Sequence, residues 1–405
     1  MKSFNKIIFS LIVIGISCNL IKLYFAQNDL ETILLEGVFP WYFKVNTLGC
    51  IFISLASVAS FALYRRYFPT YVSVCYILLI IFVTFATLND LGQAVKPSFF
   101  YSMKGIGTYI NIGILFFAAD TKYFPKILDF FYYSCFLILL GGIANLGKVG
   151  LGAERNEFLY AIRDFTVYLI WVFPFFFLQE NEDKRKNILN IACFLLIFVL
   201  IISSGSRSYL LLYFVYIAVK FKAQLQSRMG FLTILGLIVF AVAGYFIITN
   251  SSLNKTFGTA LTNLSERSKS DSRTNQLIDF LSQYDTSYLI QGVGPFKQWY
   301  WHGNGLYSYL DNQILLIAWW AGLPTIITYV YFLVKSVIIR SEILFFENVK
   351  GLKLILCLWI GACLGLAIYV SLTSESYYYF LSLLMGMNAC RYTKLLELEN
   401  EEVNK

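Results

Sequence analysis

The sequence predicts an all-α integral membrane protein with about twelve transmembrane helices and one large extracytoplasmic loop that contains short helices. Three observations support this fold class. Hydrophobic residues make up 58% of the 405 residues and charged residues only 14%, and the mean hydropathy is +0.65. Apolar runs of roughly membrane-crossing length recur along nearly the whole chain. Lys and Arg residues gather mainly in alternate loops between these runs.

Each expected span is an apolar run bounded by polar or charged residues. The spans are expected at residues 7–25, 45–63, 71–88, 105–119, 127–146, 165–179, 188–203, 208–219, 231–249, 313–334, 352–371 and 377–390. If Lys2 and Lys6 lie inside, every Lys/Arg-rich loop falls on the same side, as the positive-inside rule requires. The first apolar run lacks a small-x-small cleavage site, so we expect a retained span and not a cleaved signal peptide.

This topology predicts three parts of the chain. Residues 1–249 form an N-terminal transmembrane bundle of about nine spans, residues 250–312 form the large extracytoplasmic loop, and residues 313–405 form the last transmembrane helices and a cytoplasmic tail. The expected location is a bacterial plasma (inner) membrane, with both termini cytoplasmic and the large loop periplasmic or extracellular.

Several classes of function are disfavoured by composition. The net charge of +8 follows from the loop pattern, so it does not indicate a nucleic-acid partner. The eight cysteines all lie within apolar runs, where we expect neither disulfides nor thiol chemistry. His302 is the only histidine, which excludes a histidine metal cluster.

Arg207 lies between two strongly apolar stretches. A continuous helix over residues 187–219 would be about 50 Å long, too long for one crossing of the membrane core and too short for two. We therefore predict two short helices that turn at residues 203–208, with Arg207 recessed near the outer leaflet. The alternative is an arginine that extends its side chain to the lipid headgroups.

The large loop contains a second candidate arginine. Asp271 or Ser272 can cap a helix of about twelve residues, whose Leu277, Ile278, Leu281 and Tyr284 would share a face on the membrane surface. Arg273 then lies in the first helical turn, where free backbone N–H groups favour an anion such as phosphate. Alternatively, residues 266–271 form a solvated charge run.

Other loop residues also allow two interpretations. Residues 292–295 form a turn. An aromatic cluster follows, which can form an interfacial belt or stack against sugar rings; it consists of Phe296, Trp299, Tyr300, Trp301 and Tyr307. His302 can be a catalytic base or a polar loop residue. Asp311 and Asn312 precede an apolar span, as a helix cap or as groups that face a polar cavity.

Four motifs together resemble the superfamily of O-antigen polymerases and O-antigen ligases, which are membrane glycosyltransferases that use lipid-linked sugars. In order they are SGSRSYLLL (204–212), SERSKSDSR (265–273), GVGPF (292–296) and DNQILLIAWWAGLPT (311–325). In the ligases the last motif begins with histidine. Here Asp311 stands at that position, while Asn312 and Gly322 keep the motif's spacing. The departure favours a repeat-unit polymerase of the Wzy type.

The resemblance implies transfer of a glycan from undecaprenyl diphosphate to a sugar hydroxyl outside the membrane, without a cofactor or an obligatory metal. Arg207 and Arg273 would stabilise the pyrophosphate leaving group, because guanidinium pairs bidentately with phosphate oxygens. Asp311 would be the general base. Residues assigned to substrate binding are Arg155 and Arg163 in an outer loop, together with Arg267, Asn312, His302, Trp299 and Tyr300. Implied partners are the lipid-linked oligosaccharide, membrane lipids, a chain-length regulator and a repeat-unit flippase.

Two alternatives remain open. An O-antigen ligase would transfer finished polymer to lipid A-core, but its histidine is missing here. A transporter or lipid-linked oligosaccharide flippase of this size usually has two related halves and short loops, whereas this sequence has no internal repeat and one dominant loop.

Overall fold

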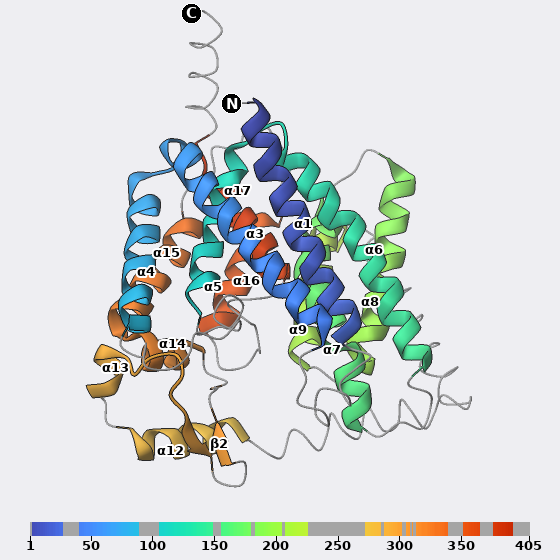
Figure 1. Ribbon diagram of the computed structural model, residues 1–405. Coiled ribbons are helices and arrows are strands. Elements are labelled where there is room, and N and C mark those ends of the chain that lie inside the picture. Colours follow the sequence, from blue (N-terminus) through green and yellow to red (C-terminus); the bar gives the residue numbers. More distant parts are fainter. Residues whose placement is uncertain are drawn as a thin grey trace, which may run out of the picture. The chain divides into compact units, whose positions relative to one another are not determined.

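The computed structural model describes most of the helical segments of the chain. The described residues are 2–26, 40–88, 105–148, 155–179, 183–204, 207–225, 272–284, 287–301, 305–307, 310, 313–338, 351–364 and 376–391. Within them the fold is helical, apart from one short two-stranded hairpin (Figure 1).

Five of the described helices are long and apolar enough to cross a membrane. They are Ser3–Phe25, Trp41–Tyr67, Thr70–Leu88, Phe124–Leu146 and Lys184–Ser203. Shorter apolar helices cover Ile106–Ala119, Ser208–Phe221, Leu323–Ile338 and Leu352–Ala362. The chain therefore has the helices of an integral, multi-pass membrane protein.

The described residues belong to two compact units. Unit 1 comprises Met1–Lys22, Gly37–Phe131 and Ser272–Lys405, and unit 2 comprises Leu23–Glu36 and Tyr132–Asp271. Helices α1 (Lys2–Ala26) and α6 (Phe124–Lys148) contribute residues to both. Unit 1 also contains α3 (Trp41–Tyr64), η1 (Arg65–Tyr67), α4 (Thr70–Leu88), α5 (Ile106–Asn111), η3 (Ile112–Ala119), α12 (Ser272–Gln283), α13 (Ser287–Gln291), β1 (Trp299–Trp301), β2 (Gly305–Tyr307), α14 (Gln313–Ala321), α15 (Leu323–Ile338), α16 (Leu352–Leu364) and α17 (Ser376–Ala389).

Unit 2 contains α7 (Arg155–Leu178), α8 (Lys184–Ser203) and α9 (Arg207–Leu225). Residues 165–178 of α7 are all buried, which is the pattern of a central helix that is apolar on every side. The rings of Phe177, Phe194 and Tyr213 form a stack that joins the three helices, with centroid distances of 4.0 and 4.3 Å. The Lys220 ammonium of α9 donates to the carbonyl of Gln179, which follows the last residue of α7, at 2.8 Å. The α8–α9 pair is thereby held against α7.

A buried polar network organises the middle of unit 1. Asn111 is fully buried at the point where α5 tightens into η3. Its side-chain oxygen accepts from Ser54 Oγ at 2.6 Å, and its backbone carbonyl accepts from Ser57 Oγ at 3.1 Å. Its amide nitrogen lies 3.4 Å from the Tyr379 hydroxyl. Because buried polar groups need partners in an apolar surrounding, this network fixes α3, α5 and α17 to one another.

Asp120 connects η3 to α6 and is 4% exposed. Its Oδ1 accepts from the backbone N–H groups of Lys122 and Tyr123, and its Oδ2 accepts from the Tyr64 hydroxyl at 2.7 Å. The carboxylate therefore satisfies donors near the start of α6 and ties that helix to the end of α3.

We expect Asp120→Ala to destabilise unit 1 by about 2–4 kcal/mol, because a cap-type interaction is lost and a buried hydroxyl is left unpaired. The matched control is Asp129→Ala, since Asp129 is exposed on α6. Thermal unfolding in mild detergent should show a lower midpoint for Asp120→Ala only. Equal midpoints for the two variants would contradict this role.

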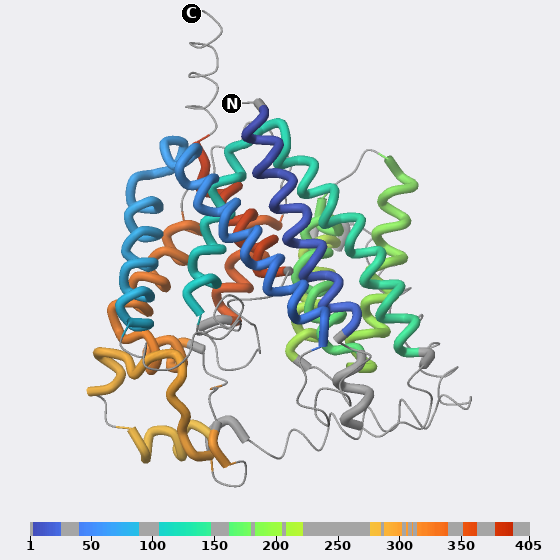
Figure 2. The backbone as a smooth tube through the Cα atoms, in the orientation of Figure 1, coloured from blue at the N-terminus to red at the C-terminus, as the bar shows by residue number. Residues whose placement is uncertain are grey.

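The helix boundaries differ from several of the expected spans. Helix α7 begins at Arg155 and not near residue 165. Helix α8 begins earlier than expected, at Lys184, and α9 ends later than expected, at Leu225. The span expected at 313–334 is interrupted at Gly322 and forms α14 and α15, the orange part of the tube in Figure 2. The expected span at 231–249 and the end of the one at 352–371 lie outside the described residues. The division into residues 1–249, 250–312 and 313–405 stays a prediction.

Candidate functional site

The helix expected after residue 271 is present as α12, and Arg273 lies in its first turn. The side chains of Gln276 and Phe280 are buried and Tyr284 is half-buried. Positions 273, 276, 280 and 284 are spaced three, four and four residues apart, which places them on one side of the helix. Gln276, Phe280 and Tyr284 therefore form the face by which α12 packs on the rest of unit 1.

The prediction that Leu277, Ile278, Leu281 and Tyr284 share one apolar face of α12 was wrong in part. Ile278 and Leu281 are 59% and 47% exposed, whereas Tyr284 packs inward beside the fully buried Phe280. The helix is anchored by this aromatic pair, because its rings contact Trp299 of β1 and Trp319 of α14.

Phe280 is the centre of an aromatic cluster that joins three elements. Its ring lies 5.5 Å from Trp299 of β1 and 5.4 Å from Trp319 of α14, both edge-on. Tyr284 adds contacts at 5.3 Å to Phe280 and 5.5 Å to Trp319. Trp299 and Trp319 are 2% and 0% exposed. The cluster thus fixes the helix that carries Arg273 to the helix that begins after Asp311 and Asn312.

Hydrogen bonds add a second attachment at the C-terminal end of α12. The Gln283 side chain accepts from the Tyr300 backbone N–H at 2.9 Å and donates to the Tyr300 carbonyl at 2.5 Å. The Tyr284 hydroxyl donates to the Gln298 carbonyl at 2.8 Å. Burial, with a smaller contribution from Tyr288, raises the pKa of Tyr284, so its hydroxyl stays protonated and can donate.

Removing the central ring should release α12. We expect Phe280→Ala to cost about 3–5 kcal/mol locally and to make residues 272–283 sensitive to an added protease. The matched control is Ile278→Ala, because Ile278 lies on the same helix and is 59% exposed. Proteolysis of intact vesicles with the loop accessible measures the difference. If both variants are cut at the wild-type rate, the cluster does not hold α12.

The β1–β2 hairpin divides the expected aromatic cluster. Its register pairs Trp299 with Tyr307, Tyr300 with Leu306, and Trp301 with Gly305. Trp299 is buried and stacks with Trp301 at 6.3 Å, whereas Tyr300 is 51% exposed. Trp299 was therefore wrongly expected to contact substrate, because it is a core residue in the contact between β1 and α12. The role of Tyr300 in substrate binding stays a prediction.

The turn at residues 292–294 has a structural role that its sequence did not indicate. The N–H groups of Val293 and Gly294 donate to the carbonyls of Trp319 and Trp320 at 2.8 and 3.0 Å. These carbonyls lie in the last turn of α14, where the helix breaks and carbonyls need hydrogen-bond donors from outside the helix. The turn therefore caps α14 from a distant part of the chain. Figure 1 shows α13, which leads into the turn, beside α14.

Two glycines make this contact possible. Gly292 and Gly322 have φ angles of +76° and +85°, which L-residues with a Cβ rarely adopt. A Cβ on Gly322 would lie 2.8 Å from the Ile290 carbonyl oxygen, and one on Gly292 would lie 2.7 Å from the Gly322 nitrogen. The two backbones thus meet without side chains between them. We call this contact between residues 290–294 and 318–322 the glycine lock.

Arg207 is the first residue of α9, and α8 ends at Ser203, so the chain turns between these helices as expected. The α8 helix alone is long enough to cross a membrane. Because α8 can cross the membrane, its length does not require the turn before Arg207 to lie within the membrane. The recessed depth of Arg207 stays a prediction. Arg207 belongs to unit 2 and Arg273 to unit 1. Their meeting at one ligand also stays a prediction.

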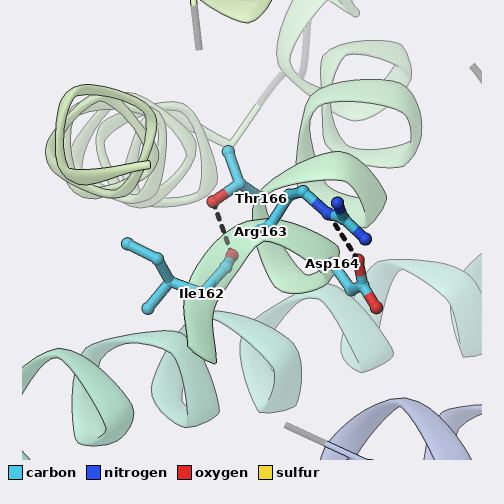
Figure 3. A network of polar contacts seen from close by, with 4 residues as sticks. All are labelled: Ile162, Arg163, Asp164 and Thr166. Carbon is cyan, nitrogen blue, oxygen red and sulfur yellow. Dashed lines mark hydrogen bonds and ion pairs between the residues drawn. The ribbon is translucent and has the colours of Figure 1, made fainter. Parts of the chain in front are cut away.

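Arg155 and Arg163, which were expected in an outer loop, belong to helix α7, which begins at Arg155. Their place outside the membrane and their role in substrate binding stay predictions. The Arg163 Nε lies 3.3 Å from Asp164 Oδ1, with 38% and 21% of the side chains exposed. Figure 3 shows this pair beside the bond from the Thr166 hydroxyl to the Ile162 carbonyl. A neighbouring carboxylate offsets part of the charge that Arg163 could offer to phosphate.

Four of the expected site residues lie outside the described residues. They are Arg267, His302, Asp311 and Asn312. In the part of the chain that the structure describes, no group of three His, Cys, Asp or Glu side chains could hold a metal ion. Sequence reasoning missed Phe280, Gln283 and Trp319. The seven-residue spacing from Arg273 to Phe280 was a usable signal for a shared helix face.

No model of a protein family matches the chain, and no curated protein matches it.

Proposed function

We propose that the chain is a membrane glycosyltransferase that polymerises undecaprenyl-diphosphate-linked oligosaccharide repeat units at the outer face of a bacterial plasma membrane. The product is an O-antigen or a related surface polysaccharide. About twelve spans, with both termini cytoplasmic and residues 250–312 outside, complete the proposed topology.

The observation that carries this proposal is the glycine lock. Two motifs of the family resemblance, GVGPF and DNQILLIAWWAGLPT, are in backbone contact through Gly292 and Gly322. The motif that ends with Arg273 leads into α12, which packs on Trp319 in the same stretch. The described residues of two motifs, and the helix that follows a third, thus belong to one packed assembly, which supports a shared active site.

The chemistry follows from the leaving group. When the sugar–phosphate bond breaks, negative charge grows on the departing undecaprenyl diphosphate. Fixed guanidinium groups stabilise that charge without a proton transfer, and the first turn of α12 adds backbone N–H groups near Arg273. Asp311 would accept the proton of the attacking hydroxyl. Arg207 would complete the diphosphate contacts from the start of α9.

Deletion of the gene tests the proposal. We expect surface glycans to change from a ladder of chain lengths to a single repeat unit, with one-repeat undecaprenyl diphosphate accumulating in the membrane. Accumulation of long polymer on undecaprenyl diphosphate would instead identify a ligase. Lipid-linked repeat units confined to the inner leaflet would identify a flippase. Either outcome would contradict the proposed function.

A further inference from the structure

Three cationic residues lie at one end of unit 1, on elements that pack together. Arg66 belongs to η1, Lys335 lies in the last turn of α15, and Arg391 follows the end of α17. The backbone N–H of Arg391 donates to the Tyr67 carbonyl at 2.9 Å, which joins the end of α17 to η1. A guanidinium nitrogen of Arg66 donates to the Tyr67 hydroxyl at 2.6 Å. Arg66 and Arg391 are therefore held at the same short helix.

Tyrosine side chains connect Lys335 to this position. Helix α15 packs along α4, which begins three residues after η1 ends (Figure 1). The Lys335 ammonium lies 5.7 Å from the centroid of the Tyr331 ring. Tyr71, near the start of α4, interacts electrostatically with both Tyr331 and Arg391. We call the three cations, together with Tyr67, Tyr71 and Tyr331, the basic patch.

The basic patch has no compensating negative charge among the described residues. Its three cations are exposed, and none of them forms an ion pair within the part of the chain that the structure describes. Asp120 reaches this end of the unit through Tyr64, but its carboxylate is buried and already accepts three hydrogen bonds. The patch therefore presents positive charge to an anion from outside the protein.

An apolar surface leads from the basic patch along both packed helices. On α15, Ile327 and Tyr331 are exposed and precede Lys335 by eight and four residues, so the three share one stripe. On α4, the exposed Val74 follows Tyr71 by three residues. Because the start of α4 interacts with the end of α15, both stripes run away from the patch, along the membrane-spanning part of each helix.

We propose that the basic patch binds the phosphodiester headgroup of an anionic phospholipid, whose acyl chains lie along the apolar stripes of α4 and α15. A guanidinium pairs bidentately with phosphate oxygens, and tyrosine is enriched at the level of lipid headgroups. The expected topology puts this end of unit 1 at the cytoplasmic face, where the leaflet carries anionic lipids. The inference is independent of the reaction that the protein catalyses.

Native mass spectrometry of the full-length protein in mild detergent tests the proposal. We expect tighter binding of dioleoyl-phosphatidylglycerol than of dioleoyl-phosphatidylcholine, and a higher midpoint of thermal unfolding with the anionic lipid. Arg66→Gln, Lys335→Gln and Arg391→Gln should each weaken binding of phosphatidylglycerol about fivefold, and the triple variant about a hundredfold. Lys186→Gln is the matched control, because Lys186 is an exposed cation of unit 2 that also lies over a tyrosine ring. It should bind as the wild type does.

Two further arms separate a lipid site from a soluble phosphate site and from a loss of folding. Glycerophosphoglycerol, the same headgroup without acyl chains, should not displace phosphatidylglycerol at equal concentration, because it lacks the contacts with the apolar stripes. Lys335→Arg keeps the charge and should retain binding, which shows that a changed side chain at this position does not unfold the site. Equal binding of the two lipids, wild-type affinity in the triple variant, or equal displacement by glycerophosphoglycerol would overturn the proposal.

Discussion

Replacing Arg207 or Arg273 by alanine is expected to reduce chain lengthening at least about a hundredfold, the cost of removing one preorganised donor from a developing anion. Arg207 is the first residue of α9, and Arg273 is the second residue of α12. Gel analysis of the surface glycan in a complemented deletion strain measures the effect. Lysine at either position should restore activity only in part, because it keeps the charge but loses the bidentate geometry.

Lys297→Ala is the control for this prediction. Lys297 is an exposed cation two residues before β1 and has no assigned role in the reaction. Its variant should give a wild-type ladder. All variants should reach the membrane in equal amounts, which a C-terminal tag measures. A fully active Arg207→Ala or Arg273→Ala protein would remove that arginine from the mechanism.

Gly322→Ala should have the largest effect on the folded protein. Alanine is strained at a φ of +85°, and its Cβ would collide with the carbonyl of Ile290. Opening the glycine lock would break the hydrogen bonds to the carbonyls of Trp319 and Trp320, at about 0.5–1.5 kcal/mol each. We expect a lower midpoint of thermal unfolding in detergent and loss of chain lengthening.

The matched control is Gly361→Ala in α16. An added Cβ at Gly361 meets nothing within 4 Å, and alanine is the better helix former. This variant should unfold at or above the wild-type midpoint. If Gly322→Ala behaves in the same way, the lock does not hold α14 to the 292–294 turn.

Hydropathy predicted most helices of the chain because a membrane span is a local property of about twenty residues. It did not predict the break at Gly322, since a window average does not register a single residue with positive φ. A signal was present: Gly322 followed by Pro324 is the pattern of one helix ending and another beginning. Similarly, Arg155 and Arg163 suggested a loop, although α7 begins at Arg155 and includes both residues.

The candidate site was predicted in parts and not as an arrangement. The start of α12 and the place of Arg273 followed from capping rules, which depend on neighbouring residues. The different burial of Trp299 and Tyr300 depends on Phe280 and Gln283, which are about twenty residues away. The capping of α14 by Val293 and Gly294 depends on tertiary contact as well. Such contacts leave no periodic pattern in the sequence.

The most direct test uses the purified protein in liposomes with a defined undecaprenyl-diphosphate-linked repeat unit and nothing else added. The account predicts a ladder of lipid-linked oligomers, with one undecaprenyl diphosphate released for each new glycosidic bond and no requirement for nucleotide sugar. Intact substrate after prolonged incubation with folded protein, or substrate moved across the bilayer without bond formation, would contradict it.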